Sequence, residues 1–362
     1  MTDLLLTFLL GLVGGLLFLN WKVPAGAMVG AMLFVAVFSI LTGRAEMPAD
    51  VRVLTQLVAG AYIGSSIQYK DVLALRRILL PALLMISLMI SLDIAMGFLL
   101  YRLTSLDLAT ALMACAPGGL MDISLISADV GANSSSVAVL QLLRLVTVLA
   151  FFPLLMKKVS ERIQTPGQTA AAPVEEPLVI SVSERAVIRN QWYLSRQKRK
   201  NLAITLLIAG LSGSLGKYLG IPAGALTLSM VCVALLNVLT GRGYLPAALR
   251  RFTQMLAGIL IGASMDASDL ALLKGVMVPA LVLIVGIIVI NLTVGLLLNR
   301  LSDLDLMTSL LASVPGGVSD MALIARDLGG DQSKVAILQL FRYLFVVALY
   351  PVLIRQLLTW FV

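Results

Sequence analysis

The chain has 362 residues, of which 59% are hydrophobic and 13% are charged, and its mean hydropathy is +0.99. An ordinary soluble domain carries about 25% charged residues, so this composition excludes a soluble globular enzyme. The apolar residues form blocks of roughly 18 to 25, each long enough to cross a hydrocarbon core about 30 Å thick as a helix. We therefore expect an all-α polytopic membrane protein embedded in a lipid bilayer.

Six hydrophobic segments are predicted in the first half of the chain. They lie at about 3–20, 24–42, 52–69, 78–101, 106–130 and 134–156. Residues 157–200 follow, with Pro166-Gly167 and a basic end, and are predicted to form a cytoplasmic linker. The six segments then return in the second half, which gives a first transmembrane repeat at 1–156 and a second at 201–362.

The second half copies the first at a constant offset of 198 residues without a gap. The most informative copies are Pro117-Gly118-Gly119, which returns as Pro315-Gly316-Gly317, and the pair Gln141 and Arg144, which returns as Gln339 and Arg342. Counting five or six spans per repeat puts 17 Lys and Arg on the linker side against 6 opposite. The positive-inside rule therefore makes the linker cytoplasmic, but it does not separate parallel from inverted repeats.

The numbers and positions of the histidine, cysteine and basic residues limit the activities that the chain can have. There is no histidine, so no imidazole metal site or imidazole base exists, and we expect no enzyme activity, no cofactor and no metal. Cys115 and Cys232 lie within apolar segments, which favours packing roles over a disulfide. Nine of the 27 Lys and Arg lie in the linker, so the net charge of +8 indicates membrane anchoring rather than nucleic-acid binding.

The segment at 106–130 is predicted to be a broken helix, as is its copy. Proline removes a backbone donor and two glycines weaken the helix further, so the break should fall at Pro117 to Gly119. In hydrocarbon, irregular backbone survives only where it is buried in protein or lines a polar cavity. Matching interrupted segments in two repeats point to the binding site of a secondary transporter, whereas a single packing kink would not recur at the same place.

Five ionisable residues are predicted at membrane depth, where their cost makes them candidates for function. Asp122 and Asp320 follow the breaks, at helix N-termini that favour a carboxylate, so a capping role is an alternative. Arg144 and Arg342 share a helix face with Gln141 and Gln339. These arginines are expected either to pair with the two aspartates or to bind a substrate carboxylate.

Asp93 differs from the other four because its counterpart in the second repeat is Asn291. A single carboxylate in the middle of a helix is a candidate for proton or sodium coupling, and the alternative is a hydrogen bond to a neighbouring helix. The Gly60/Gly64 and Gly258/Gly262 spacings are interpreted as close helix packing.

The two copies, each with Ala-Pro-Gly-Gly or Val-Pro-Gly-Gly, then Asp, then Gln-Leu-x-Arg, resemble the duplicated AbrB family of bacterial inner-membrane proteins. That family has been labelled an ammonia monooxygenase or a regulator of gene expression, and the missing histidine argues against the first label. More distantly, 115–119 is similar to the broken helix of bile-acid/sodium symporters, and the Pro-Ala-Gly segment to cation/proton antiporters. This wider resemblance implies inverted repeats whose broken helices cross at mid-membrane, and a core domain that moves like an elevator.

We therefore predict a secondary transporter of a small anionic or zwitterionic solute in a bacterial inner membrane. Coupling to protons or sodium ions is an option within this prediction. The substrate site is expected at Pro117, Gly118, Gly119, Asp122, Gln141, Arg144, Pro315, Gly316, Gly317, Asp320, Gln339 and Arg342. A membrane-bound regulator acting through the linker is the alternative, and an intramembrane aspartyl enzyme built on Asp122 and Asp320 is a weaker one. The protein could also pair with a second copy of itself as a homodimer.

Overall fold

The computed structural model describes residues 2–21, 23, 25–163, 184–265, 277–316, 321–322, 324–325 and 328–361. These residues form helices and connecting turns, with no strand among them. The first half contains α1 (Thr2–Asn20), α2 (Gly26–Thr42), α3 (Ala49–Ser66), α4 (Tyr69–Arg77), α5 (Leu79–Leu103), α6 (Leu108–Cys115), α7 (Leu120–Ser127), the 3-10 turn η1 (Ala128–Val130) and α8 (Ser134–Ile163). The second half contains α9 (Glu184–Tyr218), α10 (Gly224–Thr240), α11 (Ala247–Ala263), α13 (Met277–Leu301), α14 (Leu306–Ser313) and α16 (Gln332–Phe361).

The helices of the second half recur at the offset seen in the sequence. The bounds of α10, α13, α14 and α16 lie 198 residues after those of α2, α5, α6 and α8. Unusual backbone recurs as well, because Ala25 and Ala223 have φ of 53° and 54°, in the left-handed region that alanine rarely adopts. The same local conformation thus precedes α2 and α10.

Four of the described helices are long and apolar enough to cross a membrane. They are Thr2–Asn20, Leu79–Leu103, Val278–Leu301 and Gln332–Trp360. Shorter apolar helices occupy Gly26–Thr42, Ser134–Val148 and Gly224–Thr240. This set fits a membrane protein, although it is smaller than the five or six full spans per repeat predicted from hydropathy.

Two predicted boundaries differ from the helices of the structure. The segment predicted at 52–69 ends at Ser66, and a separate nine-residue helix, α4, follows because Gln68 and Asp71 form a capping box at its start. The ends of the predicted linker 157–200 are also helical, since α8 continues to Ile163 and α9 begins at Glu184. The central part of the linker, 164–183, lies outside the described residues.

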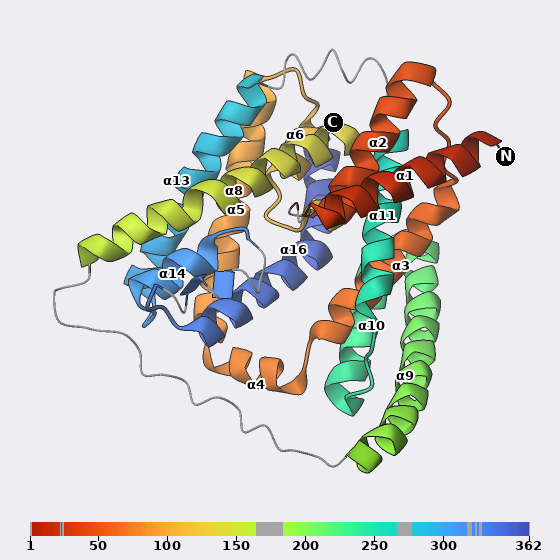
Figure 1. The fold of residues 1–362 in the computed structure, drawn as a ribbon. Coiled ribbons are helices and arrows are strands. Elements are labelled where there is room, and N and C mark those ends of the chain that lie inside the picture. Colours follow the sequence, from red (N-terminus) through yellow and green to blue (C-terminus); the bar gives the residue numbers. More distant parts are fainter. Residues whose placement is uncertain are drawn as a thin grey trace.

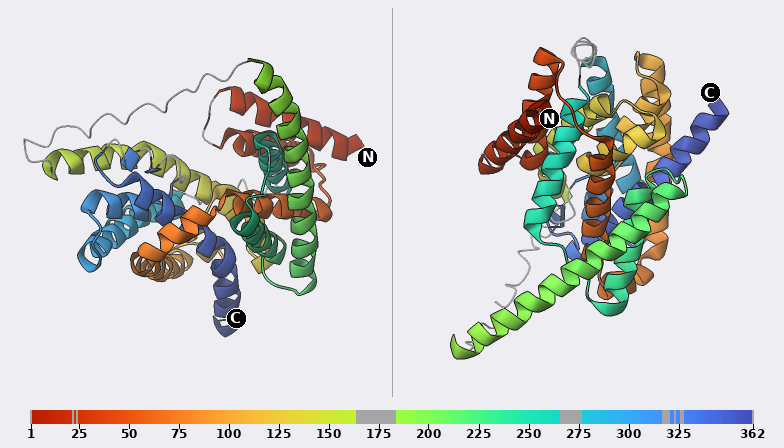
Figure 2. Two further views of the ribbon diagram at one scale, coloured as in Figure 1. Left: turned by 90° about the horizontal axis from the view of Figure 1, so that it is seen from below. Right: turned by 90° about the vertical axis from the view of Figure 1, so that its right-hand side faces the viewer.

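The described helices form two bundles, each drawing on both halves of the chain (Figures 1 and 2). Bundle one contains α1, α2, α3, α9, α10 and α11, and within it α3 packs along α10 and α2 along α11. Bundle two contains α5, α6, α7, α8, α13, α14 and α16. Between the bundles, α7 packs against α3 and α11, and α8 packs against α11. Three buried apolar clusters contain residues of both bundles, and α4 connects α3 to α5.

Glycines set the close helix crossings of bundle one. A Cβ at Gly60 or Gly64 of α3 would collide with backbone atoms of α10, and a Cβ at Gly258 or Gly262 of α11 with backbone atoms of α2. Small residues at this spacing let two helix backbones approach closely. The packing interpretation of both G-x-x-x-G motifs is therefore confirmed.

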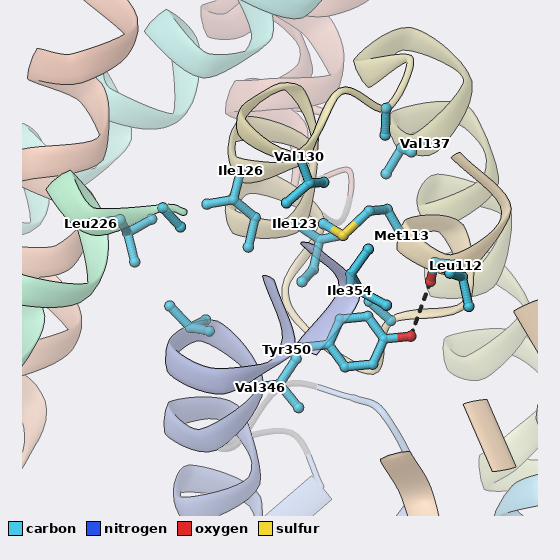
Figure 3. Close-up of a cluster of buried hydrophobic side chains, with 14 of the residues drawn as sticks. Leu112, Met113, Ile123, Ile126, Val130, Val137, Leu226, Val346, Tyr350 and Ile354 are labelled. Carbon is cyan, nitrogen blue, oxygen red and sulfur yellow. Dashed lines mark hydrogen bonds between the residues drawn. The ribbon is translucent and has the colours of Figure 1, made fainter. Parts of the chain in front are cut away.

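A buried apolar cluster shared by both bundles holds α16 against the broken segment. Leu112 and Met113 of α6, Ile123 and Ile126 of α7, and Val346, Tyr350 and Ile354 of α16 meet here, with Leu226 of α10 at the edge (Figure 3). The Tyr350 hydroxyl donates a hydrogen bond of 3.0 Å to the Leu112 carbonyl. A helix of the second half therefore fixes the helix before the break in the first half.

Candidate functional site

The polypeptide leaves helical conformation between Cys115 and Leu120, where Pro117-Gly118-Gly119 stands. In the second half α14 ends at Ser313, two residues before Pro315, and Gly317 and Asp320 lie outside the described residues. A helix that ends within apolar surroundings leaves backbone carbonyls without a partner. The candidate site is therefore built around groups that satisfy these carbonyls.

The two glutamines of the predicted site perform this role at both breaks. Nε2 of Gln141 donates to the carbonyls of Met113 at 3.2 Å and Ala116 at 3.0 Å. Nε2 of Gln339 donates to the carbonyls of Leu311 at 2.8 Å and Val314 at 2.7 Å, which lie at the equivalent positions. Both glutamines are buried and act as side-chain caps of α6 and α14.

The two arginines cap the same helix ends. The η nitrogens of Arg144 donate to the carbonyls of Ala116 and Gly118. Arg342 donates to the carbonyl of Val314 at 2.7 Å and to Oε1 of Gln339 at 2.6 Å. Each arginine is 4% exposed and keeps a buried Nε that has no hydrogen-bond partner among the described residues.

Asp122 has a different partner from the one expected. Its carboxylate accepts a hydrogen bond from the hydroxyl of Tyr343 in α16, and no ion pair joins it to an arginine of the described chain. Asp122 also lies in the first turn of α7, where the positive end of the helix dipole favours a carboxylate. The capping alternative therefore fits Asp122, and of the two roles weighed for the arginines, pairing with Asp122 is not seen among the described residues.

Asp93 is buried in the middle of α5, with 6% of its surface exposed. Its Oδ2 has no hydrogen-bond partner among the described residues, so the alternative of a bond from a neighbouring helix does not account for this oxygen. The charges that act on Asp93 are those of Arg144 and Arg342. The positive charges of Arg144 and Arg342 therefore act on Asp93, although Asp93 lies on a different helix from either arginine.

A cavity of about 750 Å³ brings together the segments that follow α6 and α14. Its wall includes Gly118, Gly119 and Asp122 from the first break, Pro315 and Gly316 from the second, and both Arg144 and Arg342. Pro117, Gln141 and Gln339 are not part of the wall, and the two glutamines support it through the hydrogen bonds above. A cavity of this volume is within the usual range for small-molecule sites, about 300–1,000 Å³.

The cavity lies between the two bundles and has a buried end and an exposed end. Bundle two supplies the buried end with the breaks, Asp122, Arg144 and Arg342. Bundle one supplies the other wall, from α2, α3 and the start of α11, and its residues Ser66 and Arg250 are exposed. A solute entering at the exposed end would therefore meet the broken segments at the inner end.

Positive charge predominates on the cavity wall. The cationic residues are Lys70, Arg144, Arg250 and Arg342, and the acidic ones are Asp71 and Asp122. Asp71 is engaged at the start of α4, where it accepts a hydrogen bond of 2.8 Å from the backbone of Gln68. No group of three potential metal-ligating side chains occurs among the described residues.

Tyr62, Arg250 and Tyr343 are among the wall residues that the predicted site does not include. Tyr343 directly follows Arg342, but its counterpart in the first repeat is Leu145, so the comparison of the repeats did not select it. Arg250 lies near the start of an apolar segment, where the sequence predicts only a basic residue that orients the protein in the membrane. Only the folded chain places these side chains next to Asp122.

The described residues form helices, and several apolar helices of membrane length beside a polar cavity fit the class of membrane proteins. Within that class the chain belongs to the AbrB family, because the family model described as "Transition state regulatory protein AbrB" matches residues 1–160 and 164–358. This confirms the resemblance carried by the repeated motifs.

Two curated proteins are similar over most of the chain. One is "Uncharacterized protein YhjN" of Bacillus subtilis (strain 168), 27% identical over 311 residues, which are 84% of this chain and 78% of that protein. The other is "Putative regulator AbrB" of Escherichia coli (strain K12), 26% identical over 343 residues, which are 93% of this chain and 91% of that protein.

Proposed function

We propose that this protein is a secondary transporter of small organic anions or zwitterions in the bacterial inner membrane. The observation that carries the proposal is the cavity between the two bundles, whose inner end is made of both helix breaks. Interrupted helices at matching positions of two repeats are the usual origin of transporter binding sites. A structural kink would need capping side chains but no polar cavity beside it.

The arrangement of the bundles supports an elevator-type movement. Bundle two holds both breaks and their caps, whereas bundle one is held together by close glycine crossings. The bundles meet mainly through buried apolar clusters, and because apolar contacts are non-directional, sliding of bundle two along bundle one would exchange one set of such contacts for another. Such sliding would carry the inner end of the cavity across the membrane.

A reversible cross-link between the bundles tests this movement. Oγ of Ser135 in α8 lies 3.2 Å from Oγ of Ser264 at the end of α11, so cysteines at these positions are close enough for a disulfide. The background is Cys115→Ala with Cys232→Ala, and a thermal-shift screen of organic anions supplies the solute. In proteoliposomes we expect oxidation of Ser135→Cys/Ser264→Cys to lower solute counterflow at least tenfold, and dithiothreitol to restore it.

The single variants Ser135→Cys and Ser264→Cys are the matched controls, and oxidation should leave their counterflow unchanged. Full counterflow by the cross-linked protein would refute relative movement of the bundles. Absence of counterflow in the wild-type protein, with a solute that stabilises it, would refute transport itself.

The proposal includes inverted repeats, a cytoplasmic linker at 157–200 and ion coupling through Asp93. A reporter fused after residue 362 distinguishes the topologies, because a periplasmic signal means inverted halves and a cytoplasmic signal means parallel halves. The basic residues at the linker support its cytoplasmic placement. The unpartnered, buried Oδ2 of Asp93 supports a role in binding a proton or a sodium ion.

A regulatory function is the second candidate, and the name of the Escherichia coli relative favours it. Under that function the linker would carry the signal to an intracellular partner. Deleting 166–184 should then abolish the effect on gene expression, whereas a transporter with this deletion should keep solute counterflow.

A further inference from the structure

The two arginines at the inner end of the cavity are poorly placed to be the main anion receptors. Their η nitrogens are used by backbone carbonyls and by Gln339, and only the single Nε of each has no partner among the described residues. A guanidinium binds a carboxylate best through two parallel N–H groups. A different cation on the cavity wall is therefore needed for firm binding of an anion.

Arg250 meets this requirement. It lines the cavity from the start of α11, and none of its guanidinium nitrogens makes a hydrogen bond or ion pair within the described part of the chain. Its guanidinium lies over the ring of Tyr62 in α3, 4.4 Å from the ring centroid. Stacking on an aromatic face holds the guanidinium while leaving its N–H edge free for a ligand.

Gln254 stands four residues after Arg250, so both side chains lie on one face of α11, and both line the cavity. The equivalent glutamine of the first repeat, Gln56, donates a hydrogen bond of 2.8 Å to the carboxylate of Asp129. The residue equivalent to Asp129 in the second repeat is Asp327, which lies outside the described residues. A glutamine at this place in the fold is thus suited to a carboxylate, and in the second repeat it faces the cavity.

The remaining wall is apolar over much of its area, with Ile63, Met121 and Leu340 among the residues beside Tyr62 and Tyr343. An inorganic anion would leave these side chains without a contact, whereas an organic acid would cover them. Burial of apolar surface contributes about 25 cal/mol per Å², so the body of such a ligand would add to its affinity.

We propose that Arg250, Gln254 and Tyr62 form the recognition site for a monocarboxylate with an apolar or aromatic body. This inference rests on the proposed transport function and names its substrate class. The carboxylate binds the N–H edge of Arg250 and the amide of Gln254, and the apolar body extends toward Tyr343 and the breaks. The equivalent of Tyr62 in the second repeat is Leu260, so the site exists once per chain.

Thermal unfolding of the purified full-length protein in detergent tests the site, with phenylacetate and hexanoate as probes. We expect both to raise the unfolding temperature, and phenethylamine and inorganic phosphate at equal concentration to leave it unchanged. Arg250→Gln should weaken binding of the carboxylates at least tenfold, and Tyr62→Leu should weaken it to a smaller extent. Arg251→Gln is the matched control, because Arg251 is exposed and is not part of the cavity wall.

Three outcomes would overturn the site: stabilisation by phosphate equal to that by the carboxylates, full stabilisation of Arg250→Gln, or no stabilisation by either carboxylate. Arg250→Lys keeps the charge but not the planar edge, so it should retain the wild-type unfolding temperature without ligand and still bind weakly. A protein that binds normally after Arg250→Gln and passes the cross-linking test would remain a transporter with a different recognition site. Loss of counterflow in the wild-type protein would instead refute the proposed function.

Discussion

Replacing Arg144 by methionine removes the cationic cap of α6 while keeping a long apolar side chain. The carbonyl of Ala116 retains its hydrogen bond from Gln141, at 3.0 Å, but the carbonyl of Gly118 has no other hydrogen-bond donor among the described residues. A buried hydrogen bond to a charged group contributes about 1.5–3 kcal/mol. Since one carbonyl is left without a partner and the other keeps one, we expect a loss of about 3 kcal/mol in the free energy of unfolding.

The same reasoning applies to the second cap. In Arg342→Met the carbonyl of Val314 keeps Gln339 at 2.7 Å, but the carbonyl of Ser313 loses a hydrogen bond of 3.4 Å and the buried Oε1 of Gln339 loses one of 2.6 Å. A buried acceptor loses its donor in each variant, so the loss for Arg342→Met should be similar to that for Arg144→Met. At about 2 °C per kcal/mol for a chain of this size, Arg144→Met should unfold about 6 °C below the wild-type protein.

Thermal unfolding followed by tryptophan fluorescence in detergent measures both losses. Arg102→Met, at the exposed C-terminal end of α5, is the control for removal of a positive charge. If Arg144→Met unfolds within about 1 °C of this control, the arginine does not hold the helix break, and the capping account is refuted.

Three further predictions concern single contacts. Tyr343→Phe should lower the unfolding free energy by about 1–2 kcal/mol, because Asp122 loses a hydrogen bond, while Tyr218→Phe, at an 87% exposed tyrosine, should change nothing. Gly60→Ala should lower the free energy of unfolding by about 1–3 kcal/mol through overpacking against α10. Gly210→Ala is the control, because a Cβ there meets nothing within 4 Å, and it should be neutral or stabilising by up to about 1 kcal/mol. Equal effects of the two variants would contradict the close crossing of α3 and α10. Asp93→Asn should abolish stimulation of uptake by an imposed proton or sodium gradient in proteoliposomes, and an unchanged response would exclude Asp93 from coupling.

The sequence was sufficient for the features that occur twice. The offset of 198 predicted the recurrence of helix bounds, and Pro117-Gly118-Gly119 marked where the helix stops, because backbone chemistry is local. The sequence also placed Gln141 and Arg144 on one helix face, since that follows from helical spacing. What that face meets depends on packing between distant segments, so the capping of α6 was not predicted.

The charge partners were less accessible to sequence reasoning. Electrostatic complementarity suggested Asp122 with Arg144, but a carbonyl-rich helix end competes for the same guanidinium, and the aspartate bonds Tyr343 instead. The place of Arg250 in the cavity depends on the contact of α11 with α3, two segments from different halves. No local pattern separates this arginine from its neighbour Arg251.

The differences between the repeats fall where the chemistry of the site is expected. The glycine crossings and the Gln and Arg caps are the same in both halves, because both halves face the same problem of packing helices and satisfying carbonyls. Three polar side chains at or near the site are replaced in the other half: Asp93 by Asn291, Tyr343 by Leu145 and Tyr62 by Leu260. A duplicated fold with symmetric contacts would offer two equivalent sites. Because of these replacements, the proposed site at Tyr62 and the unpartnered carboxylate of Asp93 each occur in one half only. Leu260→Tyr should place a ring near Arg52, the equivalent of Arg250, but should not raise the number of phenylacetate molecules bound above one, because Arg250 lines the cavity and Arg52 does not. Binding of two phenylacetate molecules by this variant, measured by equilibrium dialysis, would contradict the single site.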